Sequence, residues 1–158
     1  MTKTIVKDDF DSANEVPSNW VKWNTVGDDK IFGTLMRKMK GENAYKPGEM
    51  VENYEIKADY GSFHNVDEKK NLIETPITIN LGEIWSVGGK DGIAKQMANV
   101  KIGQKLGFKY IDEKVSRTKG HQPAKLIKVF TPKNDDGSYK MDEEWLAQDD
   151  MASAIKDF

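Results

Sequence analysis

The sequence contains no cysteine and only two histidines, His64 and His121. The first absence excludes disulfide bonds and thiolate metal sites, and the second excludes a histidine-rich zinc site. No apolar run approaches the roughly 18 residues of a membrane span, and the N-terminus lacks the apolar core of a signal peptide. We therefore expect a cytoplasmic protein without a cofactor and without a membrane partner.

Catalytic signatures are missing as well. Residues 88–92, GGKDG, resemble a phosphate-binding glycine turn but have neither the GxxxxGK[ST] nor the GxGxxG spacing. Paired carboxylates occur at 28–29 and 143–144, with nothing that places them around a cleft. Neither histidine lies in a recognisable motif for nucleophilic catalysis. The sequence therefore predicts a protein that is not an enzyme.

Charge is plentiful but unevenly distributed. Residues 132–158 hold eight acidic residues and three lysines, a net charge of −5, whereas residues 19–131 hold 19 basic and 14 acidic residues, a net charge of +5. A mildly basic body with an acidic tail indicates a polyanionic ligand and a segment that can compete with it. Acidic tails also serve as solubilising ends, so this alternative stays open.

Alternating apolar and polar residues indicate strands along most of residues 31–130. The segment 104–131 is the clearest, with two strands around a basic loop at 113–122. Further strands are expected at 31–39, with Gly33 as a bend, at 50–60 and at 75–87. Residues 61–71 are typical of a polar loop. A short helix is expected over 91–98, capped by Asp91 and with Ile93 and Met97 on one face.

Five strands with one short helix between the third and the fourth is the order of an oligonucleotide-binding (OB) fold. The sequence thus predicts a mainly β protein whose residues 19–131 form a five-stranded OB-type barrel. A flexible arm, 1–18, would precede the barrel and an acidic tail, 132–158, would follow it. Another small antiparallel barrel or a sandwich is the alternative.

In OB folds the ligand usually lies across strands two and three, between the loop joining strands one and two and the loop joining four and five. Both corresponding segments are basic here, which suits a single-stranded nucleic acid. The residues predicted to hold phosphates are Lys38, Lys40, Lys46, Lys114, Arg117, Lys119 and Lys125. The residues predicted to stack on bases are Tyr45 and Phe63, in expected loops, and less directly Trp23 and Trp85. Tyr54 and Tyr60 share a face with Ile56, and we expect that face to be the inner one.

Four segments, KWNTVGDDKIFGTL (22–35), YEIKADYG (54–61), VKIGQKLGFKYIDE (100–113) and PAKLIKVF (123–130), carry a resemblance to a family. They resemble small phage-encoded proteins with an OB-type single-stranded-DNA-binding domain. The resemblance covers about residues 19–145 and implies binding of single-stranded DNA with little sequence preference, in replication or recombination within the host cytoplasm. The alternative is a structural or protein-interaction OB module of a phage particle.

The chain ends DDMASAIKDF. An acidic end with an aromatic last residue resembles the tails through which single-stranded-DNA-binding proteins recruit partners. This tail lacks the bacterial proline before the last residue, and Lys156 interrupts its acidic run. Residues 143–154 could instead form an amphipathic helix. We expect the tail to contact replication or recombination proteins through Trp145, Leu146, Asp157 and Phe158. The oligomeric state stays open, a homodimer included.

Overall fold

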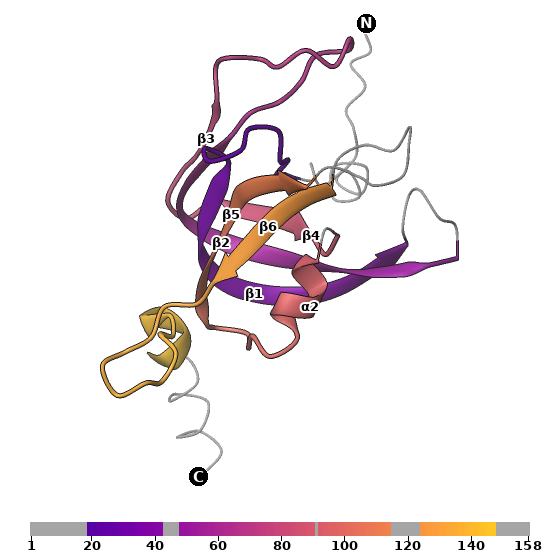
Figure 1. The fold of residues 1–158 in the computed structure, drawn as a ribbon. Helices are drawn as coiled ribbons and strands as arrows, with labels where there is room; N and C mark the ends of the chain where they lie inside the picture. The colour runs from indigo at the N-terminus through magenta and orange to yellow at the C-terminus, as the bar shows by residue number, and fades with distance from the viewer. Residues whose placement is uncertain (1–18, 43–47, 91, 115–123, 148–158) are drawn as a thin grey trace, which may run out of the picture.

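The computed structural model describes residues 19–42, 48–90, 92–114 and 124–147, and it shows a mainly β protein (Figure 1). Its elements, in chain order, are β1 (Lys30–Glu42), β2 (Met50–Phe63), β3 (Ile77–Ile79), β4 (Ile84–Gly88), α2 (Ile93–Met97), β5 (Lys105–Lys114) and β6 (Ala124–Phe130). The strands form one antiparallel sheet in the order β3-β2-β1-β5-β6, and β4 also pairs with β2. The predicted mainly β class is confirmed, but the sheet has six strands and is not closed.

The third predicted strand, 75–87, is interrupted, and this part of the prediction is wrong. β3 pairs with Gly61–Phe63, whereas β4 pairs with residues 53–57 of β2. Between them lies a turn in which Gly82, at φ +85°, adopts a conformation that residues with a side chain rarely take. The turn is fixed to β2 because Ala58 donates to the Glu83 carbonyl and accepts from the Gly82 N–H.

A bulge in β2 lies opposite this turn. Phe32 pairs with Tyr60 and Gly33 pairs with Ala58, so Asp59 is the extra residue. Gly33 was predicted as a bend, and the register shift beside it confirms an irregularity there. A Cβ on Gly33 would overlap the carbonyl of Lys57, so only glycine permits this close approach.

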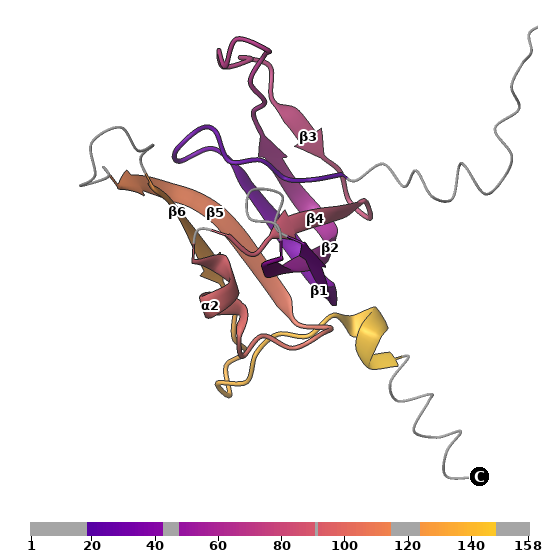
Figure 2. The same cartoon turned by 90° about the vertical axis from the view of Figure 1, so that its right-hand side faces the viewer.

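The two ends of the curled sheet are covered by other segments (Figure 2). On β4, Val21 donates to the Ser86 carbonyl and Ser86 donates to the Asn19 carbonyl, at 2.9 and 2.7 Å. On β6, the side-chain amide of Gln96 in α2 donates to the Ile127 carbonyl and accepts from the Val129 N–H. One side-chain amide thus satisfies two backbone groups of β6, as a neighbouring strand would.

The core lies between the inner face of the sheet and α2. It contains large side chains from every strand and from the segment before β1: Val21, Trp23, Leu35, Tyr54, Ile56, Phe63, Ile79, Trp85, Met97, Phe108 and Ile127. Ile93 and Met97 of α2 face inward, as predicted. The helix begins later than expected, with Gly92 at its N-cap and no side-chain cap. Asp91, the predicted cap, lies outside the described residues.

A buried carboxylate joins the segment before β1 to the end of β2. Asp29 is fully buried, and its Oδ2 accepts from the backbone N–H groups of Asn24 and Thr25 at 2.7 and 2.8 Å. Its Oδ1 accepts from the His64 N–H at 3.0 Å and lies 2.9 Å from the His64 Nδ1. A buried carboxylate with this many partners fixes both segments, since each bond compensates for lost hydration.

The first part of the predicted acidic tail packs against the sheet. Met141 pairs with Gln104, the Asp142 N–H donates to the Gly103 carbonyl at 2.7 Å, and residues 143–147 form a helical turn. The indole of Trp145 lies on Gly103. The described residues 132–147 are therefore part of the folded body. The predicted arm, 1–18, and the tail end with Asp157 and Phe158 lie outside the described residues.

Candidate nucleic-acid interface

The lysines predicted to hold phosphates are divided between several roles. Lys38 donates its ammonium to the Met97 carbonyl at 3.0 Å, and Lys125 donates to the carbonyl of Trp23. Both ammonium groups thus hold the fold together. Lys40 and Lys114 are exposed at strand ends. The other three, Lys46, Arg117 and Lys119, lie outside the described residues, as does Tyr45, so a groove between the two basic loops stays a prediction.

The predicted stacking residues that the structure describes are core residues, so that prediction is wrong for them. Phe63 is 2% exposed because β2 continues to this residue instead of ending before it. It makes an edge-to-face contact with Trp85 at 5.4 Å between ring centroids. Trp23 is buried as well. None of these three rings can accept a base without unpacking the core.

Tyr60 takes the opposite position from the predicted one. Tyr54, Ile56 and Ala58 point inward, as the period of two predicts. The bulge at Asp59 then shifts the alternation by one residue, so Tyr60 turns outward and is 55% exposed. The same shift turns Phe63 inward.

An aromatic row crosses the outward face of four strands. Tyr60 in β2 pairs with Phe32 in β1, and their rings stack with centroids 5.5 Å apart and planes within 16°. Phe32 pairs with Gly107 in β5, which pairs with Phe130 in β6, and Phe130 is 43% exposed. A Cβ on Gly107 would approach the Phe32 ring to 2.9 Å, so the glycine leaves room for that ring. We call Tyr60, Phe32 and Phe130 the aromatic row.

A lysine row runs beside the aromatic row, two residues along each strand. Lys30 pairs with Lys109, and Lys109 pairs with Lys128. Lys128 also lies 5.5 Å from the centroid of the Phe130 ring. Within the described part of the chain, none of these three lysines makes an ion pair with a carboxylate. We call Lys30, Lys109 and Lys128 the lysine row.

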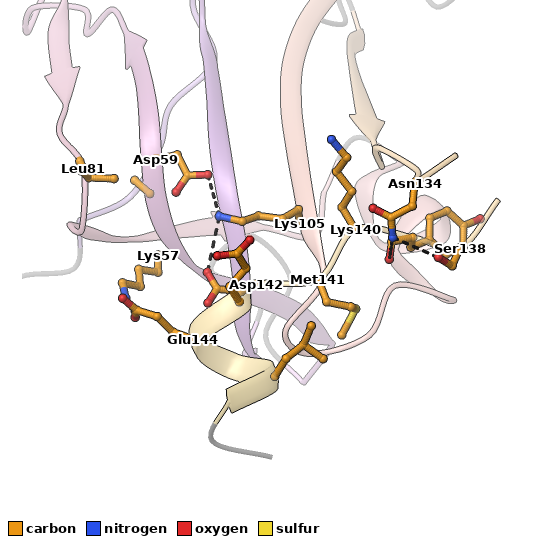
Figure 3. A pocket seen from close by; sticks show the side chains of 14 residues that line it. Lys57, Asp59, Leu81, Lys105, Asn134, Ser138, Lys140, Met141, Asp142 and Glu144 are labelled. Carbon is orange, nitrogen blue, oxygen red and sulfur yellow. Dashed lines mark hydrogen bonds and ion pairs between the residues drawn. The ribbon is translucent and has the colours of Figure 1, made fainter. Parts of the chain in front are cut away.

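The opposite side of the aromatic row is rich in carboxylates. A groove of about 880 Å³ lies there between β2, β5 and the segment 132–147 (Figure 3). Lys105 lies between two of its carboxylates, 2.8 Å from Asp59 and 3.5 Å from Asp142. Lys57 pairs with Glu144 at 2.9 Å, and this hydrogen-bonded carboxylate raises the pKa of Lys57. We call Asp59, Asp142 and Glu144 the acidic edge.

Asp142 is the most constrained member of the acidic edge. Its Oδ2 accepts from the Thr34 hydroxyl at 2.7 Å and its Oδ1 accepts from the Trp145 N–H at 3.1 Å. Burial raises the pKa of Asp142, but these hydrogen bonds and the nearby Lys105 outweigh it and lower the pKa below its usual value. Asp142 is therefore an anion that ties the C-terminal segment to β1 and β5.

The exposed groups of this face are aromatic rings and charged side chains. Within the described ranges, no group of three histidine or carboxylate side chains is placed to hold a metal ion. None of the helices described there has the length and the apolar character needed to cross a membrane. The aromatic rings offer stacking surfaces, and the adjacent lysines offer positive charge, which together are the two requirements of a site for single-stranded nucleic acid.

The sequence contains a signal for these rows. Lysine and phenylalanine recur two residues apart, as Lys30 and Phe32 and again as Lys128 and Phe130, with one residue between them. A period of two places both on the outward face of a strand.

Comparison of the chain with protein-family models, with curated proteins and with solved structures finds no significant match.

Proposed function

We propose that this protein binds single-stranded DNA across the outward face of its sheet, with little sequence preference, in replication or recombination. The observation that carries the proposal is the aromatic row beside the lysine row. Bases would stack on Tyr60, Phe32 and Phe130, while phosphates would follow the lysines. Stacking tolerates any base because every base has a π face.

The lysine row supports an anionic ligand for an energetic reason. Like charges directly opposite each other on neighbouring strands destabilise a sheet. Lys30, Lys109 and Lys128 form two such pairs in succession, without a carboxylate partner in the described residues. A phosphate backbone would remove this repulsion by neutralising the charges, and binding would release counterions from the nucleic acid.

The dimensions agree with a short stretch of nucleic acid. The aromatic row extends from β2 to β6, three steps between neighbouring strands, or about 14 Å. A strand of DNA would therefore run across the β-strands rather than along them, with a few nucleotides in contact at once.

The finer fold assignment is part of the same proposal. The order β3-β2-β1-β5-β6, with α2 before β5, supports an OB fold in which β3 and β4 would together form the third strand. The phage-encoded single-stranded-DNA-binding family resembled by the sequence has this domain. The aromatic row crosses β2, β1, β5 and β6, and thus differs from the usual OB site on strands two and three.

Fluorescence anisotropy with a labelled single-stranded oligonucleotide of mixed sequence tests the function. We expect log affinity to fall against log salt concentration with a slope of roughly −2 to −4. Changing the lysine row to glutamine (Lys30→Gln, Lys109→Gln, Lys128→Gln) should weaken binding of all sequences and flatten that slope. A matched variant changes three exposed lysines elsewhere, Lys22→Gln, Lys69→Gln and Lys95→Gln.

The matched variant has the same net charge, so it separates the row from a general electrostatic effect. It should bind more tightly than the lysine-row variant by at least about tenfold at low salt. If the two variants lose DNA affinity equally, the lysine row is not the binding site for the phosphates. No measurable binding at low salt by the unaltered chain would remove nucleic-acid binding altogether and favour a protein partner for the aromatic row.

A further inference from the structure

The aromatic row lies between edges of opposite charge. On β5, Lys109 is two residues to one side of Gly107 and Lys105, held by Asp59, is two residues to the other. Two residues of an antiparallel strand span about 6.8 Å. A nucleotide stacked on this row therefore has the lysine row within reach at one end and the acidic edge within reach at the other.

This asymmetry would favour one direction for a bound nucleotide. Its phosphate and the Watson–Crick edge of its base lie at opposite ends. The lysine row offers the phosphate three positive charges without a carboxylate partner in the described residues. At the acidic edge Lys57 and Lys105 are already paired with the three carboxylates, which leaves a net charge of −1 that disfavours a phosphate there. The base edge must then point toward the acidic edge, and the first carboxylate that it reaches beside Tyr60 is that of Asp59, the adjacent residue.

Asp59, the residue next to Tyr60, has an available oxygen. Its Oδ2 accepts from the Lys105 ammonium at 2.8 Å, while its Oδ1 makes no hydrogen bond with any described residue. Its side chain is 30% exposed. Asp142, in contrast, uses both oxygens, for Thr34 and Lys105 and for the Trp145 N–H.

An ionised carboxylate can only accept hydrogen bonds. Cytosine presents its N4 amino group as a donor, and carboxylates are known acceptors for it. Uracil and thymine present a carbonyl oxygen at the same position, which a carboxylate repels. A carboxylate placed at this group would therefore distinguish the two kinds of pyrimidine at one nucleotide, even though stacking along the row accepts both.

We infer that the nucleotide stacked at Tyr60 and Phe32 is read by Asp59, which favours a base with an exocyclic amino group over uracil or thymine. This inference rests on the proposed function, because it requires a nucleic acid on the aromatic row. It adds a position of base preference to a site that otherwise binds through phosphates and ring faces.

The test compares oligonucleotides of deoxycytidine and of deoxyuridine, which differ only at this base edge, at pH 7.5 and one salt concentration. The unaltered chain should bind the deoxycytidine oligonucleotide about tenfold more tightly, the value of one hydrogen bond to a charged group. Asp59→Asn should reduce this ratio to about twofold or less, because the amide turns a donor toward the base while its oxygen still accepts from Lys105. Glu68→Gln, at an exposed turn, makes the same charge change and should leave the ratio unaltered.

The outcomes separate the two proposals. If neither oligonucleotide binds, nucleic-acid binding fails and the inference fails with it. If both bind equally to the unaltered chain, the function stands and the role of Asp59 is overturned. A ratio that survives in Asp59→Asn, with an unaltered melting temperature, also overturns that role, since the discrimination would then come from another group.

Discussion

Gly103 lies against the indole ring of Trp145, so closely that a Cβ on Gly103 would overlap the ring atoms Cδ1, Nε1 and Cγ. Gly103 also has a φ of +90°, which L-residues rarely adopt. Gly103→Ala should therefore lose about 1–2 kcal/mol through backbone strain and a further amount on the order of 1–3 kcal/mol through displacement of the indole. Urea unfolding, followed by tryptophan fluorescence, measures the sum of these two losses in the free energy of unfolding.

Gly137→Ala is the matched control for that substitution. Gly137 has a φ of +88°, but a Cβ on it would meet no atom within 4 Å, so its loss is the strain alone. Equal destabilisation by the two substitutions would contradict a contribution of the Trp145 contact to stability.

Truncation after Thr131 should lower the melting temperature, because residues 140–146 hydrogen-bond to residues 103–105 and cover Gly103. It also removes Asp142 and Glu144 from Lys105 and Lys57, and the freed charges should tighten DNA binding at low salt. Melting temperature and oligonucleotide affinity are measured side by side. A destabilised chain without tighter binding would exclude the predicted competition between the acidic tail and the ligand.

Acid should weaken the attachment of the C-terminal segment. The pKa of Asp142 is lowered in the folded protein, so its contribution to stability is present above the unfolded-state pKa of about 3.9 and is lost as the pH falls through the folded value. Asp142→Asn should be less stable at pH 7, and the difference from the unaltered chain should shrink below about pH 4. Unfolding at pH 7, 5, 4 and 3 checks this. A difference that does not change with pH would contradict it.

Asp29→Asn should destabilise the fold by about 2 kcal/mol or more, because one oxygen acceptor is replaced by an NH₂ group that faces backbone N–H donors. Asp28→Asn is the control, since Asp28 is the adjacent residue and is exposed. Thermal unfolding of the two variants compares them. Similar melting temperatures would mean that the buried hydrogen bonds contribute little.

Tyr60→Ala should weaken single-stranded DNA binding by about 1–3 kcal/mol, the value of one stacked base, with little effect on stability. Phe63→Ala should instead cost about 3–5 kcal/mol of stability, as for a large core side chain. Tyr139→Ala removes another exposed tyrosine, which is not a member of the aromatic row; it lies under Lys133 and lines the groove beside the row. Anisotropy and thermal unfolding of the three variants are compared. Equal affinities for Tyr60→Ala and Tyr139→Ala would exclude Tyr60 as a stacking residue.

Period and composition predicted much of the local structure but not its register. The alternation of Tyr54, Ile56 and Ala58 correctly identified the inner face of β2. The extra residue at Asp59 reversed the prediction for Tyr60 and Phe63. A bulge depends on how β2 pairs with β1, and the spacing within one strand contains no information on that pairing.

The candidate site required two further kinds of non-local information. Lys30, Lys109 and Lys128 become neighbours only through the registers of three strands. Lys38 and Lys125 looked available for phosphates, but each donates to a carbonyl from a distant part of the chain, which no local pattern indicates. The sequence therefore identified the basic side chains, but it did not identify which of them are hydrogen-bonded within the fold.

The amide of Gln96 has a consequence for how copies of this protein meet one another. Unpaired N–H and carbonyl groups on an outer strand are a template for the strands of other molecules, and such pairing leads to aggregates. Because the Gln96 side chain bonds to the Ile127 carbonyl and to the Val129 N–H, these two groups of β6 are not available for pairing with another strand. A single glutamine thus makes two backbone groups of β6 unavailable to the strand of another copy, and it does so without closing the sheet.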